Sequence, residues 1–258
     1  MELGPDDLAA LRRAKGLLET TSLAARLANA IGTPVDKLLG ALPEGASQIV
    51  LKATNKSITV ALDVALSALG DSQRNPRLWQ SKAVVAATGA AGGAFGLPAL
   101  VLELPASTIL MLHSIAEIAR NEGELLTSAE SKLACVQVFA LGGTTSVDDA
   151  AETGYFAVRL ALAKSVTEAV EFIAKRGIAD RGAPAMVKLV SSIAARFGVR
   201  VSQKAMAQLV PVIGAAGGAF MNVIFMDHYQ DMAKGHFVVR RLERQFGAEV
   251  VKDAYLRL

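Results

Sequence analysis

The chain has 258 residues, enough for one large domain or two small ones. Its formal net charge is only +3, from 27 basic and 24 acidic residues, which argues against a nucleic-acid-binding protein. Hydrophobic residues make up 52% of the chain and aromatic residues only 5%, so Ala, Val, Leu and Ile carry the apolar content, as suits closely packed helices. The single cysteine, Cys135, excludes an internal disulfide, and its apolar neighbours indicate a core position in a reducing compartment.

The N-terminal segment lacks the features of an export signal. Residues 1–7 are acidic, and Arg12, Arg13 and Lys15 interrupt the sequence before an apolar segment long enough for export can form. We therefore expect the protein to reside in the cytoplasm, including a peripheral position at the inner face of the membrane.

Apolar residues recur at helical spacing along most of the chain. Pro5, followed by Asp6 and Asp7, predicts the first turn of a short amphipathic helix, because proline and acidic residues are both favoured there. The later helices are expected over Ser47–Leu69 with Gly70 at its end, from a capping box at Thr127–Glu130, over Tyr155–Ala174 ended by Gly177, over Pro184–Phe197, and from Val199 after a break at Gly198.

No strand pattern and no low-complexity linker accompanies these helices. The loops between them are short, which favours one domain over two. We therefore predict an all-α fold, a single helical bundle, in which residues 1–45 form N-terminal helices that pack on a core domain of residues 46–258.

One heptapeptide, Gly-Ala-Ala-Gly-Gly-Ala-Phe, occurs twice, at residues 89–95 and 214–220. Each glycine weakens a helix by about 1 kcal/mol relative to alanine, so two copies indicate close backbone packing or a bend at two related places. We expect two pseudo-repeated helical hairpins bent at these copies. The structural glycines would be Gly89, Gly92, Gly93, Gly214, Gly217 and Gly218.

Each copy lies in a stretch without a charged residue, over residues 83–102 and 205–226. As a helix, either stretch is long enough to cross about 30 Å of hydrocarbon, although its glycine and proline content makes insertion marginal. Two interpretations stay open: buried hairpins in a soluble bundle, and hairpins that contact lipid. A phosphate-binding loop is disfavoured, because neither copy has a Gly-Lys-Ser/Thr ending or a preceding strand.

Several segments resemble the EcsC protein family. Residues 211–222 and 235–247 are similar to the C-terminal part of that family, and Gly96-Leu97-Pro98, Glu103-Leu104-Pro105, residues 112–116 and residues 135–142 are similar to its central part. The resemblance covers approximately Lys52 to Gly247. It implies bacterial origin and work close to the membrane, since the family is named for a gene beside an ABC exporter operon. It supplies no catalytic residue.

Two groups of side chains could hold a metal ion. On a helical wheel, Glu103, His113 and Glu117 share a sector of about 80°, and Asp227, His228 and Asp231 share one of about 100°. Carboxylates and imidazoles on facing helices of a bundle are suitable ligands, which would make the protein a helical, hydrolase-like metalloenzyme. The simpler interpretation is a set of exposed i,i+3 and i,i+4 pairs worth a few tenths of a kcal/mol, as is more common.

Glu103 stands in an apolar run, where an unpaired carboxylate would cost several kcal/mol to bury. We expect it to cap a helix that begins near Pro105, the more frequent role of an acid at such a place. The alternative is a partner from the second glycine copy, either Asn222 or His228, which lies eight residues beyond the phenylalanine of its copy as Glu103 does.

The C-terminal segment contains two further candidate groups. One is a polar network of Asn222, His236, Arg240 and Glu243, which fall within about 60° on the wheel of a continuous helix. The other is a set of basic residues that could meet anionic lipid headgroups at about 1 kcal/mol each: Lys234, Arg241 and Arg244.

We therefore expect a non-enzymatic accessory protein that associates with membrane lipid or with a membrane protein complex and binds no nucleic acid. The alternatives are the metalloenzyme and a soluble carrier of an apolar ligand. No Ser-His-Asp, Walker or zinc-finger spacing occurs in the sequence.

Overall fold

The computed structural model describes residues 3–19, 23–31, 45–70, 99–142, 154–177, 182–208 and 214–258. Helices account for nearly all of these residues, and no strand occurs within these ranges. The predicted all-α fold is therefore confirmed. The division into residues 1–45 and 46–258 stays a prediction.

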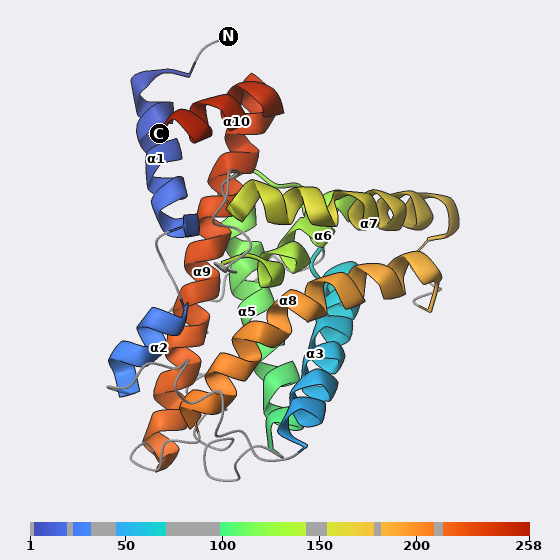
Figure 1. Ribbon diagram of the computed structural model, residues 1–258. Helices are drawn as coiled ribbons and strands as arrows, with labels where there is room; N and C mark the ends of the chain where they lie inside the picture. The colour runs from blue at the N-terminus through green and yellow to red at the C-terminus, as the bar shows by residue number, and fades with distance from the viewer. Residues whose placement is uncertain are drawn as a thin grey trace.

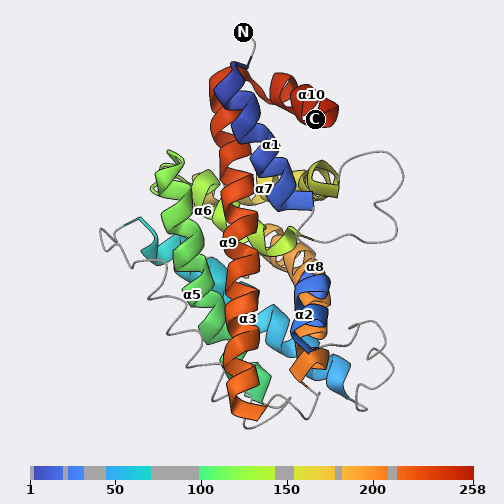
Figure 2. The same cartoon turned by 90° about the vertical axis from the view of Figure 1, so that its left-hand side faces the viewer.

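The longest helix, α9 (Gly214–Phe246), runs the length of the molecule (Figure 1). Helix α1 (Pro5–Glu19) lies along the C-terminal half of α9, and α5 (Leu100–Asn121) lies along another side (Figure 2). After Gly247 the chain turns into α10 (Ala248–Arg257), which packs on α9 and α1. Helix α9 is thus the element on which the bundle is assembled.

The remaining helices complete the bundle around α5 and α9. They are α2 (Leu23–Ile31), α3 (Ala46–Ala68), α6 (Ala129–Gln137) with the 3-10 turn η3 (Val138–Ala140), α7 (Gly154–Arg176) and α8 (Pro184–Gln208). Helix α3 packs along α5, and α8 crosses α3. Helix α7 packs on α8, α2 contacts α8 and α9, and α6 lies among α3, α5 and α7.

Helix α1 shows how the sequence pattern forms the helices. Pro5 occupies its first position and two acidic residues follow in the first turn, as predicted. Leu11, Ala14 and Leu18 are buried, and their spacing puts them on one face of the helix.

Cys135 on α6 is fully buried, as predicted for a core residue, and burial raises the pKa of its thiol.

Gly198 does not break a helix, contrary to the prediction. Helix α8 runs through it without interruption, because packing against α3 outweighs the weak helix propensity of one glycine. A methyl group built at Gly198 would lie 3.8 Å from the Thr54 Cγ2 atom, an ordinary contact.

The predicted capping box is one residue out of register. Helix α6 begins after Ser128, whose side chain accepts a hydrogen bond from the Ser131 backbone N–H at 3.1 Å. Thr127 is therefore not the N-cap. Glu130 lies in the first turn of the helix, where its negative charge interacts favourably with the helix dipole.

The hairpins predicted at the glycine copies are not confirmed. The first copy, residues 89–95, lies outside the described residues, together with Gly89, Gly92 and Gly93. The second copy forms about the first two turns of α9, so Gly214, Gly217 and Gly218 are helical where a bend was expected. Tertiary packing of a long helix can offset the unfavourable propensity of its glycines.

Helix α5 is long and apolar enough to cross a membrane, the one such helix among the described residues. In the bundle, 61% of its apolar window is buried against other helices. Core helices of soluble proteins share these properties, so length and composition alone do not place α5 in lipid.

Two glycine substitutions test the packing of α9 against α1. A methyl group at Gly235 would lie 2.6 Å from the Leu18 Cγ atom and 3.0 Å from the Ala14 carbonyl oxygen, so Gly235→Ala should lower the free energy of unfolding by about 1–3 kcal/mol. The control is Gly198→Ala, which has room for the methyl group and should raise the free energy by about 0.5–1 kcal/mol. Urea unfolding measures both, and a stabilising Gly235→Ala would show that the two helices are not in this close contact.

Candidate functional site

The loop between α5 and α6 begins with a helix-ending motif that depends on glycine. Gly123 has a φ of 81°, a left-handed conformation that glycine adopts at little cost. The backbone N–H of Glu124 donates to the Ala119 carbonyl at 2.9 Å and that of Gly123 to the Arg120 carbonyl at 3.0 Å, the two bonds of a Schellman motif. This turn places the next residue, Glu124, within hydrogen-bonding distance of Arg240 and Arg244 on α9.

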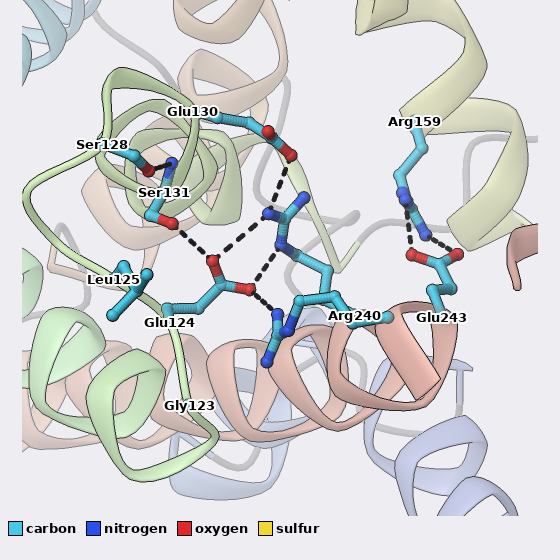
Figure 3. A pocket seen from close by; sticks show the side chains of 10 residues that line it. Gly123, Glu124, Leu125, Ser128, Glu130, Ser131, Arg159, Arg240 and Glu243 are labelled. Atoms are coloured by element: carbon cyan, nitrogen blue, oxygen red, sulfur yellow. Dashed lines mark hydrogen bonds and ion pairs between the residues drawn. The ribbon is translucent and has the colours of Figure 1, made fainter. Parts of the chain in front are cut away.

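Glu124 is the centre of a buried polar cluster (Figure 3). Arg240 donates from Nε to Oε1 at 2.8 Å and from Nη2 to Oε2 at 3.2 Å. Arg244 also donates to Oε1, and the Ser131 hydroxyl donates to Oε2 at 2.6 Å. Each carboxylate oxygen thus accepts two hydrogen bonds, and only 2% of the side chain is exposed.

The electrostatics of the cluster favour an ionised Glu124. Burial by itself would raise the pKa of Glu124, but the hydrogen bonds from Arg240 and Ser131 and the charges of Arg240 and Arg244 hold it below its ordinary value. Because both oxygens are already occupied by donors, Glu124 has no lone pair directed at a metal ion or at a substrate proton. The carboxylate positions the two arginines and is unsuited to act as a base.

A second ion pair lies beside this cluster. Arg159 on α7 donates to both carboxylate oxygens of Glu243, at 2.6 and 3.0 Å, and to the Tyr155 hydroxyl at 3.3 Å. The same hydroxyl lies 2.9 Å from the Nδ1 atom of His236. Burial, with the charges of Arg159 and Arg240, lowers the pKa of His236 well below its ordinary value, so the ring is neutral at pH 7.

The two groups of charges line a pocket of about 430 Å³ between the α5–α6 loop, the start of α6, α7 and the C-terminal part of α9 (Figure 3). Three guanidinium groups and three carboxylates contribute to its wall, so their formal charges balance. The lining residues are Gly123, Glu124, Leu125, Ser128, Glu130, Ser131, Arg159, Arg240, Glu243 and Arg244.

The predicted polar network on α9 is found in part. His236, Arg240 and Glu243 all belong to the polar groups around this pocket, through partners in the α5–α6 loop and on α6 and α7 that helical spacing on α9 could not reveal. Asn222 is also buried, but it is not part of this group. It lies about 21 Å from His236 along the helix axis, since 14 residues at 1.5 Å each separate the two.

The three basic residues predicted to meet lipid headgroups all have carboxylate partners. Lys234 lies 3.2 Å from Asp231, and Arg241 lies 2.8 Å from Glu122. Arg244 contacts Glu124 and donates to the Glu122 carbonyl at 2.6 Å. Their charges are therefore largely compensated within the protein.

The predicted metal ligands do not come together. Among the described residues, no three His, Cys, Asp or Glu side chains form a group that could hold a metal ion. On α9, Asp231 pairs with Arg26 of α2 at 2.5 Å, Asp227 is half-buried, and His228 packs against Gly142.

His113 and Glu117 are both half-buried on α5. Burial lowers the pKa of His113. Burial raises the pKa of Glu117, while the charge of Arg120 opposes that rise. Neither shift depends on a residue of the second predicted ligand group.

Glu103 neither caps a helix nor pairs with the second glycine copy. Helix α5 begins at Leu100, before Glu103, so this residue is inside the first turn. The Lys204 Nζ atom on α8 donates to its Oε1 at 2.8 Å, and both side chains are buried. Lys204 also lies over the Phe225 ring, 5.3 Å from its centroid.

Sequence reasoning missed Glu124, Arg159, Tyr155 and Lys204 as members of these clusters. The Glu-Gly-Glu sequence at 122–124 gives a local signal, since glycine after a helical segment predicts a Schellman turn. No local signal marks Lys204 or Arg159, because their partners are 101 and 84 residues away in the chain.

The lowered pKa of Glu124 should make the free energy of unfolding depend on pH. Because the pKa is lower in the folded state, the stabilisation should be complete above about pH 4.3 and decrease as the pH falls through the folded-state pKa. Glu124→Gln should lower the free energy of unfolding by about 3 kcal/mol at pH 7 and by progressively less as the pH is lowered toward 3.

Urea unfolding across this pH range, followed by circular dichroism, measures that difference. Glu168→Gln is the control, because it removes a carboxylate paired with Lys188 at the surface and should cost less than about 1 kcal/mol. A loss for Glu124→Gln that is the same at pH 7 and pH 3 would contradict the proposed role of the ionised carboxylate.

Comparison with known proteins places most of the chain in one family. The model of the EcsC protein family matches residues 8–242, from the first helix to Leu242 on α9, so Glu243 and Arg244 lie beyond the match. No curated protein and no solved structure matches the chain. Because the match covers most of the 258 residues, the chain belongs to the EcsC protein family.

Proposed function

We propose that this EcsC-family chain is a non-enzymatic accessory protein that binds the membrane surface at the end of the bundle where α5 and α9 begin. We define this apolar end by three exposed residues: Leu51, Leu102 and Phe220. The observation that carries the proposal is that the described parts of both uncharged stretches lie at this one end.

The arrangement of the helices supports this grouping. Helices α3, α5 and α9 all begin at the end drawn lowest in Figures 1 and 2, and α8 finishes there. The start of α5 belongs to the uncharged stretch 83–102, and the end of α8 and the start of α9 belong to the stretch 205–226. Two segments far apart in the sequence thus contribute to one surface.

Large apolar side chains are exposed at this end. Leu102 is 74% exposed in the first turn of α5, Phe220 is 53% exposed near the start of α9, and Leu51 is 61% exposed in the second turn of α3. Complete burial of such a side chain in hydrocarbon is worth about 1.5–3 kcal/mol. Together they offer enough apolar surface for interfacial binding.

Charges at the same end suit an anionic membrane. Lys52 and Lys56 are exposed on the first half of α3, next to Leu51, and each basic residue near an anionic surface contributes about 1 kcal/mol. The acidic residue closest to Leu102 in the chain, Glu103, is buried and neutralised by Lys204. A cytoplasmic protein would meet such lipids at the inner face of the membrane.

The alternative of a metalloenzyme has less support, because the six predicted metal ligands do not gather into one group in the described part of the chain. Glu103 and Asp231 are occupied by Lys204 and Arg26, and no metal-binding group of three ligands forms in the described part of the chain. Glu124, the most buried carboxylate of the pocket, is saturated with donors.

Liposome flotation tests the proposal. The wild-type protein should float with vesicles of phosphatidylglycerol and phosphatidylcholine, and the double variant Leu102→Glu/Phe220→Glu should remain at the bottom of the gradient. Both side chains are exposed, so the variant should keep the wild-type circular dichroism spectrum and unfolding midpoint.

The control is Leu160→Glu, which removes a leucine that is 71% exposed on α7, away from the apolar end. It should float as the wild type does. Wild-type protein that stays at the bottom, as it would if it reached the membrane only through a protein complex, would contradict direct lipid binding. Equal flotation of the double variant would contradict the assignment of this end.

A further inference from the structure

We infer that the pocket around Glu124 is a binding site for a phosphate monoester, held by Arg240, Arg244 and the N-terminus of α6 in the place now taken by the Glu130 carboxylate. This site is independent of the proposed membrane contact. Arg240 is about 30 Å from Phe220 along α9, as 20 residues at 1.5 Å each require.

The charge distribution around Glu124 favours an added anion. Two guanidinium groups, from Arg240 and Arg244, converge on this single buried carboxylate. The remaining positive charge is balanced by Glu130, which contacts Arg240 Nη2 at 3.1 Å. The side chain of Glu130 is 67% exposed, so that contact is a weak surface ion pair that a better anion can replace.

The geometry of the donors suits a phosphate group. Arg240 is fixed by its two bonds to Glu124, so its guanidinium does not have to be ordered when a ligand binds. The pocket also includes Ser128, Glu130 and Ser131, from the N-cap and first turn of α6, where backbone N–H groups and the helix dipole attract anions. Planar guanidinium groups bind phosphate oxygens in pairs.

The other carboxylates near the pocket do not oppose binding strongly. Glu243 accepts two hydrogen bonds from Arg159, and Glu122 is paired with Arg241. The saturation of Glu124 also makes it unsuited to act as a base. A pocket of about 430 Å³ has room for a small phosphorylated molecule or for a phosphomonoester headgroup.

Isothermal titration with inorganic phosphate and with glycerol phosphate tests the site. Glu130→Gln removes the competing carboxylate, so it should tighten binding about two- to five-fold, the equivalent of a surface ion pair. Arg244→Gln should weaken binding about ten-fold or more, through the loss of a charge-assisted hydrogen bond. Glu168→Gln on α7 changes the net charge as Glu130→Gln does, and it should leave the affinity unchanged.

A flotation series with phosphatidic acid vesicles distinguishes the two sources of the phosphate. If the ligand is soluble, Glu130→Gln improves binding of glycerol phosphate and leaves flotation unchanged; if it is a lipid headgroup, Glu130→Gln increases flotation. Either result supports the phosphate site. The inference is overturned if Glu130→Gln improves neither measurement, or if it improves them no more than Glu168→Gln does. Glu130 is exposed, so this test remains valid even if Arg244→Gln fails to fold.

Discussion

The hydrogen-bonded, buried carboxylate of Glu124 is the interaction on which the part of the bundle around the C-terminal half of α9 depends. Its burial would cost several kcal/mol if its oxygens lacked partners. Arg240, Arg244 and Ser131 supply four hydrogen bonds and thereby connect three elements: the loop after α5, the start of α6 and the C-terminal part of α9. The position of α6 against α9 is therefore coupled to the ionisation of one side chain.

The same interaction sets the properties of the pocket. Arg240 and Arg244 are held in place by a group that is itself unavailable for chemistry, so the pocket presents ordered cations next to a helix N-terminus. Binding can then use the exposed side of these cations, where Glu130 is the weakest contact. A fold that fixes its arginines from behind in this way is suited to recognising an anion.

The two ends of α9 have contrasting characters. The first turns carry the exposed Phe220, at the end where α5 begins with the exposed Leu102, whereas the last turns carry arginines paired with Glu122 and Glu124. The Glu103–Lys204 pair joins α5 to α8 toward the apolar end. Each of these two buried side chains offsets the cost of burying the charge of the other. A single helix thus connects the end proposed to contact lipid with the pocket proposed to bind a phosphate.

Local features of the fold could be predicted from the sequence. Pro5 with its two acidic followers and Gly177 at the end of α7 act within one helix turn, and the structure confirms both. Predictions failed where packing between helices decides the outcome: Gly198 continues a helix, and the second glycine copy begins one.

The candidate site was predictable only on one helix. Helical spacing put His236, Arg240 and Glu243 together, but it also included Asn222, because a wheel shows direction and ignores distance along the axis. The partners Glu124, Arg159 and Lys204 come from distant parts of the chain, and a single sequence contains no information about which distant residues meet.

A double-mutant cycle between Glu124 and Arg240 tests the central claim most directly. The free energies of unfolding of the wild type, Glu124→Gln, Arg240→Gln and the double variant would be measured in urea at pH 7. If the buried ion pair organises this part of the fold, the coupling energy should be about 2–3 kcal/mol, and the double variant should be less destabilised than the sum of the single ones. A coupling energy below about 0.5 kcal/mol, the value for independent sites, would contradict this account.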